Sequence, residues 1–247
     1  MTITQILKKS LSDFKSPYFL GLSLLPFVVV ALLFGYGWFG FGGDLLAQAQ
    51  ASLAAGQVPF LDAGSHPWLT AVLTFAPVQW LFTLFFYLVG IVAVVLLSVV
   101  VAAIVIGFFT PVIVKKIQKK HYPDFRFTNQ DFTLAASIPY YIKIVVIFVV
   151  LGLVALPFMF IPAVNFIAIN IPFYYLFHSF MLLDVGSNIV GKEEFRKLVK
   201  KHKALFRSTT ATLYGISLVP LLGLFLQVFY VIVLAHEFFE KAAEERA

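Results

Sequence analysis

Residues 156–165 read LPFMFIPAVN and join two long apolar segments, residues 138–160 and 163–185. Pro157 and Pro162 each interrupt a continuous helix, because a proline lacks an N–H donor and its ring clashes with the preceding helical turn. The junction contains no charged residue, whereas a loop in open water is usually polar. The chain is therefore predicted to reverse or kink sharply here, with the tip of the turn in or near lipid.

Basic segments flank this apolar pair, at residues 115–126 and 192–207. Lys and Arg collect in the cytoplasmic loops of membrane proteins, so both ends of the pair are expected in the cytoplasm. We therefore predict a helical hairpin over residues 132–185 that enters and leaves the membrane by the same face.

The composition is that of an integral membrane protein. Hydrophobic residues make up 61% and charged residues 12% of the 247 residues, and several apolar runs reach the roughly 18–20 residues of a helical span. The absence of cysteine excludes disulfide and thiol chemistry. The net charge of +6 comes from residues beside the predicted spans, so we expect contact with membrane lipid and no nucleic acid.

The chain before the hairpin divides by apolarity and charge. It is predicted to form an interfacial helix at 2–15, a span at 18–41, an outside loop at 42–71, a long span at 72–110 and a basic cytoplasmic loop at 111–131. The outside loop contains no Lys or Arg, which orients the chain with a cytoplasmic N-terminus. The long span exceeds the roughly 30 Å of hydrocarbon in a bilayer, which favours one long tilted helix.

The chain after the hairpin is predicted to contain a basic amphipathic helix at 186–208, a second hairpin at 209–236 and a charged tail at 237–247. Residues 220–223 (PLLG) break the last apolar stretch, and they repeat the pattern of residues 162–165 (PAVN). One kinked span with an outside C-terminus is the alternative. The fold class is an all-α integral membrane protein, a single polytopic domain with two long transmembrane helices, two re-entrant or kinked helical hairpins and amphipathic surface helices.

Catalytic motifs are sparse. Residues 35–40 match the glycine string of dinucleotide-binding proteins, but they end an apolar span instead of following a strand, so we interpret them as a span exit. No phosphate-binding loop, no H-E-x-x-H and no nucleophile elbow is present, and His236-Glu237 is an isolated pair. We expect no enzyme activity, no cofactor and no metal site.

Polar residues within the second leg of the central hairpin are candidates for a solute pathway. They are Asn165, Asn170, His178 and Asp184. Polar groups in hydrocarbon are costly, and they commonly face a bundle interior or a wet path. The alternative is structural: Asn165 caps a helix, Asn170 bonds to a neighbouring helix, and Asp184 sits at the interface.

A second candidate site is the helix start near Pro17. Free N–H groups and the partial positive charge of a helix N-terminus favour an anion. We therefore predict substrate contacts from Lys15, Ser16, Tyr18 and Phe19.

The order of these parts resembles the CysZ-type sulfate transporter family, which shares its domain with the etoposide-induced membrane proteins. The similar motifs are Ser16-Pro17, Leu25-Pro26, residues 161–165 (IPAVN), 173–176 (FYYL), 206–207 (FR), 214–215 (YG), 220–223 (PLLG) and 235–236 (AH). The resemblance implies two long spans, two partly inserted hairpins, cytoplasmic amphipathic helices, a homo-oligomer and sulfate uptake for cysteine biosynthesis.

One departure from that family concerns its anion ligands. The family places a glycine, an apolar residue and one or two arginines after the first proline, whereas Pro17 is followed here by Tyr18-Phe19-Leu20-Gly21. Lys15 is the nearest replacement, but a lysine lacks the bidentate fork of arginine.

These observations predict a permease or channel of the cell inner membrane for a small inorganic anion, with sulfate as the first choice, in support of sulfur assimilation. Without an ATP site, transport would be channel-like or driven by an ion gradient. The alternative is a non-transporting membrane adaptor or scaffold that binds lipid or protein partners through residues 192–207.

Overall fold

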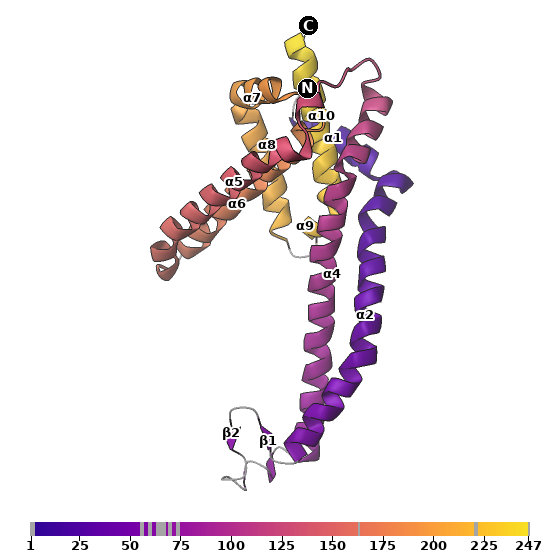
Figure 1. Cartoon of the computed structure of the whole chain (residues 1–247), viewed down its shortest axis with the longest axis vertical. Helices are drawn as coiled ribbons and strands as arrows, with labels where there is room; N and C mark the ends of the chain where they lie inside the picture. The colour runs from indigo at the N-terminus through magenta and orange to yellow at the C-terminus, as the bar shows by residue number, and fades with distance from the viewer. Residues whose placement is uncertain are drawn as a thin grey trace. The chain divides into compact units, whose positions relative to one another are not determined.

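The computed structural model describes residues 3–54, 57–58, 61–62, 68, 71–72, 75–162, 164–219 and 222–246. Its helices are α1 (Ile3–Phe14), α2 (Pro17–Ala54), α4 (Ala76–His121), α5 (Leu134–Ala155), α6 (Val164–Gly186), α7 (Lys192–Lys201), α8 (Lys203–Ser217), α9 (Leu222–Phe225) and α10 (Gln227–Arg246) (Figure 1). The 3₁₀ turns η2 (Asn129–Asp131) and η3 (Leu156–Phe160) join helices, and the two-residue strands β1 (Gln57–Val58) and β2 (Leu61–Asp62) pair antiparallel.

Four helical segments are long and apolar enough to cross a membrane. They are Pro17–Ser52, Ala76–Val95, Ala136–Phe160 and Val164–Gly186. The predicted all-α membrane class is therefore confirmed.

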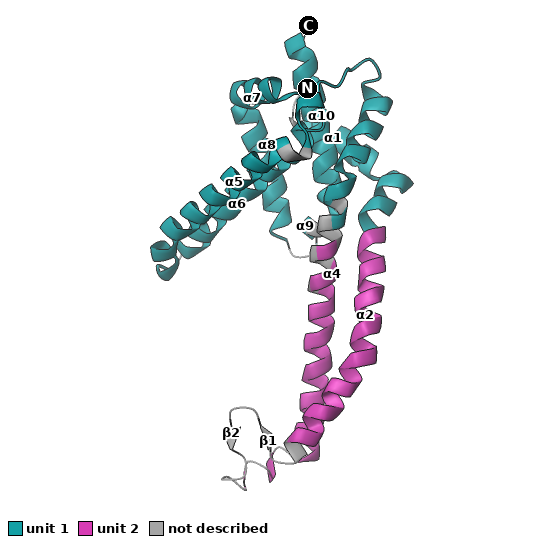
Figure 2. Ribbon diagram, in the orientation of Figure 1, with its two compact units in different colours: residues 1–24, 103–247 teal, residues 25–102 magenta. Residues whose placement is uncertain are grey.

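The described helices group into two compact units (Figure 2). One contains residues 1–24 and 103–247, and the other contains residues 25–102. Because α2 and α4 are long, each contributes residues to both units.

The first unit is built around α10. Residues 228–239 of this helix are all buried, and their apolar members pack with Phe19, Ile113 and Phe206 in one apolar cluster. Phe238 meets Phe206 with ring centroids 4.7 Å apart. A helical stretch that is apolar on every side, as residues 228–235 are, is buried either in lipid or in protein, and here protein surrounds it.

The central hairpin forms where the prolines predict it. Pro157 lies in η3 directly after α5, and α6 begins two residues beyond Pro162. Asn165 N–H donates to the carbonyl of Ile161 at 3.0 Å, which starts the new helix. Phe160 at the tip is 86% exposed, as an apolar turn that meets lipid would be.

The second hairpin region contains α8, α9 and α10. The chain changes direction between α8 and α10, near the predicted PLLG break, but Pro220 and Leu221 lie outside the described residues. Whether this segment enters lipid stays a prediction.

Several element boundaries differ from the predicted ones. α2 continues to Ala54, beyond the predicted span end at Phe41, and α4 continues to His121, into the predicted loop at 111–131. Lys119, Lys120 and His121 form the last turn of α4, where positive charge complements the helix dipole. Basic residues that mark the cytoplasmic side can therefore extend a helix instead of ending it.

The predicted amphipathic helix at 186–208 is divided at His202, whose backbone leaves the helical conformation between α7 and α8. Gly35, Gly37 and Gly40 lie inside α2, with no strand before them, so the dinucleotide interpretation has no structural support. The outside loop predicted at 42–71 is helical to residue 54. Residues 55–56, 59–60, 63–67 and 69–70 within it lie outside the described part of the chain.

The second unit contains an aromatic contact between α2 and α4. Trp38 stacks on Phe86 with ring centroids 5.0 Å apart, and a Cβ at Gly90 would lie 1.9 Å from the Trp38 ring. Gln50 Nε2 donates to Thr83 Oγ1 at 3.0 Å nearer the β1–β2 end. Glycine at position 90 is therefore required for the indole to lie flat against α4.

Candidate functional site

A network of polar side chains joins α6 to α8 within the first unit. His178 Nδ1 lies 2.6 Å from Thr210 Oγ1, and the Thr210 hydroxyl donates to the carbonyl of Phe206 at 2.8 Å. Tyr174 donates to the carbonyl of Arg207 at 3.0 Å and lies 3.3 Å from Thr210 Oγ1. Since the Thr210 proton is directed to a carbonyl, the His178 ring nitrogen is the donor in their contact.

The network continues one turn further along both helices. The Tyr214 hydroxyl donates to Asn170 Oδ1 at 2.8 Å, and Asn170 Nδ2 donates to the carbonyl of Phe166 at 2.7 Å. The rings of Tyr174 and Tyr214 meet edge to face, with centroids 5.6 Å apart. Asn170, Tyr174 and His178 stand four residues apart, so they share one face of α6.

A cavity of about 700 Å³ adjoins this network. It lies among α6, α8 and the first turn of α10, and its polar lining consists of Asn170, Tyr214, Ser217 and Gln227. Gln227 Oε1 is buried and has no hydrogen-bond partner among the described residues. Neutral amide and hydroxyl groups at the wall of an otherwise apolar cavity can hydrogen-bond a small polar solute without a fixed charge.

The predicted pathway residues separate into two groups. Asn170 and His178 belong to the network, whereas Asn165 is exposed at the start of α6. Asp184 Oδ2 accepts a hydrogen bond from Thr110 Oγ1 at 2.7 Å, near the other end of α6. The structure therefore joins Asn170 and His178 in one network, whereas Asn165 lies at the exposed start of α6 and Asp184 is hydrogen-bonded to Thr110 of α4.

The residues predicted to bind substrate at the start of α2 differ in their exposure and in their contacts. Lys15 is exposed, and Ser16 N–H already donates to the carbonyl of Asp13 at 3.0 Å. Lys116 Nζ lies 3.8 Å above the centre of the Tyr18 ring, which adds a cation that the sequence did not associate with this site. Phe19 is 2% exposed and packs in the core, so only its backbone N–H remains for a ligand.

Sequence reasoning missed Tyr174, Thr210 and Tyr214. Tyrosine and threonine are ordinary residues in apolar helices, so composition does not single them out. The available signal was spacing, because Tyr174 stands midway between Asn170 and His178, and Thr210 and Tyr214 are likewise four residues apart on α8.

Comparison with known families gives one match. A family model described as sulfate transporter CysZ/etoposide-induced protein 2.4 matches residues 6–227, which include the start of α2 and the whole α6–α8 network. Neither a curated protein nor a solved structure matches the chain.

Proposed function

Because this chain belongs to the family described as sulfate transporter CysZ/etoposide-induced protein 2.4, we propose that it is a permease or channel for a small inorganic anion, with sulfate as the first choice. The family is a transporter type, and the four apolar helical segments suit a multi-pass membrane protein. The proposal includes the inner membrane, a cytoplasmic N-terminus, a homo-oligomer, a role in cysteine biosynthesis and no enzyme activity.

The observation that carries the proposal is the polar network beside the α6–α8 cavity. Polar groups are expensive inside apolar helices, and they commonly mark solute pathways there. Asn170 and Tyr214 belong to both the network and the cavity wall. A solute in this cavity would replace hydrogen bonds that the two side chains now make with each other.

An anion is the preferred solute for electrostatic reasons. The net charge of +6 and the basic residues beside the apolar segments attract anions to the cytoplasmic side. Lys15, Lys116 and the first N–H groups of α2 supply further positive potential. These groups replace the arginines that are absent after Pro17, and they predict weaker anion binding than a bidentate fork would provide.

Sulfate flux into proteoliposomes tests the proposal. We expect saturable sulfate uptake above that of empty vesicles, with chloride as the selectivity control. Tyr214→Phe should reduce uptake by roughly fivefold, because it removes one hydrogen bond of about 1 kcal/mol at the cavity wall. Tyr36→Phe is the matched control, since Tyr36 is 85% exposed and belongs to the other unit.

Two results would count against the proposal. If folded protein gives no flux above empty vesicles, the anion function is wrong and the adaptor hypothesis becomes the leading one. If Tyr214→Phe transports sulfate as fast as the unaltered protein, transport does not use the α6–α8 cavity.

A further inference from the structure

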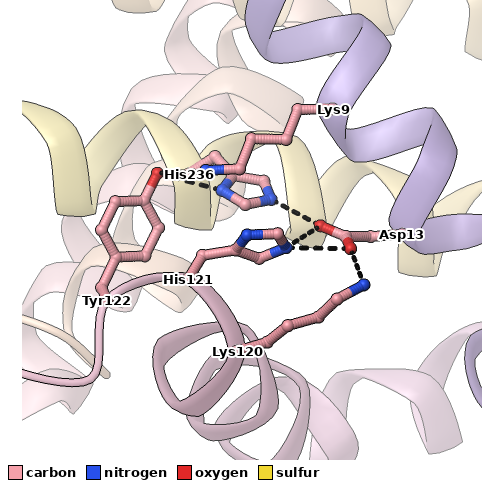
Figure 3. Close-up of polar contacts among 6 residues, drawn as sticks. All are labelled: Lys9, Asp13, Lys120, His121, Tyr122 and His236. Atoms are coloured by element: carbon pink, nitrogen blue, oxygen red, sulfur yellow. Dashed lines mark hydrogen bonds and ion pairs between the residues drawn. The ribbon is translucent and has the colours of Figure 1, made fainter.

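Asp13 is a buried carboxylate on which groups from α4 and α10 converge (Figure 3). It lies near the end of α1 with its side chain 2% exposed. His121 and Lys120 reach it from the end of α4, and His236 reaches it from α10. The α6–α8 network does not include any of these residues.

The two imidazoles face the same carboxylate through the same ring nitrogen. His121 Nε2 lies 3.0 Å from Oδ1 and 2.9 Å from Oδ2 of Asp13, and His236 Nε2 lies 2.8 Å from Oδ2. One ligand atom from each of the three residues lies within 4.8 Å of the others. Two imidazoles and a carboxylate form a common ligand set of zinc sites that keep a fourth position open.

A hydrogen bond on the far side fixes the orientation of His236. The Tyr122 hydroxyl lies 3.1 Å from His236 Nδ1, and Lys9 Nζ donates to that hydroxyl at 3.4 Å. Histidines that bind metals typically use their other nitrogen in such a bond, which holds the ring in place. Nε2 of His236 is therefore aimed at Asp13 before any ligand arrives.

The charges around Asp13 permit a cation. Lys120 Nζ, His121 Nε2 and His236 Nε2 all lie within hydrogen-bond distance of the Asp13 carboxylate, so its oxygens already serve as acceptors for an ammonium and two imidazoles. Lys120 Nζ now holds Oδ1 at 2.6 Å, but this side chain is 54% exposed and can turn into water. The negative charge of Glu240 interacts with Lys9 and partly offsets the positive charge of the Lys9 ammonium.

An approach from solvent also exists. His121 is 21% exposed at its side chain, and it lines a cleft of about 540 Å³ together with Tyr122, Asp124 and Arg246. A hydrated cation can therefore reach the imidazole without unfolding the core.

We propose that Asp13, His121 and His236 bind one divalent transition-metal cation, zinc as the first choice, with Tyr122 as the hydrogen-bond partner of His236. The cation replaces the Lys120 ammonium on Asp13, and water completes the coordination. The bound metal joins α1, α4 and α10. This inference does not depend on the transported solute.

Cobalt titration of the purified, chelator-treated full chain in detergent tests the proposal. We expect one Co²⁺ per chain, with the strong visible absorption of four-coordinate cobalt, and displacement of the cobalt by Zn²⁺. His236→Gln and Asp13→Asn should abolish that spectrum. Tyr122→Phe should weaken binding by roughly 10- to 100-fold, the usual loss when a histidine's hydrogen-bond partner is removed. Lys120→Met should bind at least as tightly as the unaltered chain, because the competing ammonium is gone.

His202→Gln is the matched control, because His202 also contacts a carboxylate, that of Glu245, at 3.4 Å, but lies outside the cluster. It should leave binding unchanged. Absence of saturable cobalt binding by the unaltered chain overturns the proposal, as does a spectrum that survives His236→Gln. If His236→Gln fails to fold, two measurements still test the proposal. They are the cobalt spectrum of the unaltered chain and the loss of cobalt affinity in Tyr122→Phe.

Discussion

Arg246 makes the most extensive set of side-chain contacts near the end of α10. Its Nε and Nη2 donate to the two carboxylate oxygens of Glu194, at 2.7 and 2.8 Å. Its other donors reach the carbonyl of Arg126 at 2.7 Å and Thr128 Oγ1 at 3.0 Å. The guanidinium also lies 4.4 Å from the centre of the Phe125 ring. A planar fork is required for this geometry, so lysine could not replace it.

The ion pair between Glu194 and Arg246 predicts a specific pH dependence of stability. Burial opposes ionisation of Glu194, but hydrogen bonds from Arg246 and Thr128 hold its pKa below the ordinary value of 4.5. A lowered pKa means that the stabilisation is complete above 4.5 and is lost as the pH falls further. Glu194→Gln should cost about 1 kcal/mol at pH 7, measured by thermal unfolding in detergent. The difference from the unaltered chain should shrink below pH 4.5, and a constant difference would contradict this account.

Single residues were only partly predictable from the sequence. Asn170 and His178 are conspicuous because amide and imidazole groups are rare in apolar helices, and the structure brings both into one network. Asp13 and His236 are separated by 223 positions in the chain, so no local pattern could associate them. The sequence suggested that His236 and Glu237 form an isolated pair. In the structure His236 contacts both Asp13 and Tyr122.

At the scale of elements, the sequence predicted the presence of helices better than their surroundings. The apolar run in α10 has the same pattern whether lipid or protein covers it, and only tertiary contacts show that residues 228–239 are buried in protein. The sequence did not predict that α4 continues to His121, because basic residues are compatible with two structures. They are common in cytoplasmic loops, and they also stabilise the C-terminal turn of a helix.

The end of α6 depends on a glycine that admits two aromatic rings. A Cβ at Gly186 would lie 2.6 Å from the Phe195 ring and 2.7 Å from the Phe238 ring. Gly186→Ala should therefore destabilise the protein by about 1–3 kcal/mol through overpacking, observed as a lower Tm.

Gly152→Ala in α5 provides the control for this substitution. A Cβ there meets nothing within 4 Å, and alanine favours the helix over glycine by about 1 kcal/mol. Its Tm should stay equal or rise. Equal effects of the two substitutions would show that the aromatic contact at Gly186 is unimportant.

At the scale of the whole molecule, the contacts of α1 with α10 predict the membrane topology. Asp13 on α1 and His236 on α10 are hydrogen-bonded within one unit, and Phe14 meets Phe229 with ring centroids 5.8 Å apart. Neither helix is among the four segments long and apolar enough to cross a membrane, so we expect two helices in such contact to lie on the same side of it. Both chain termini should therefore be on one side.

Reporters fused to each terminus measure on which side of the membrane that terminus lies. A cytoplasmic reporter should be active at both ends, and an exported reporter should be inactive at both. A control fusion within residues 55–67, which are part of the outside loop predicted at 42–71, should give the opposite result. Opposite readings at the two termini would favour the kinked-span alternative for residues 209–236.

The contact between α1 and α10 also has a consequence for biosynthesis. A ribosome makes α1 first, so Asp13 waits through the synthesis of more than two hundred residues before His236 is available. Until then, Asp13 has only its partners from α4, Lys120 and His121, and Phe14 of α1 lacks its contact with Phe229 of α10. The assembly step that closes the first unit must follow release of the last helix, so a chain stalled before α10 presents an unfinished surface that quality-control proteases can recognise.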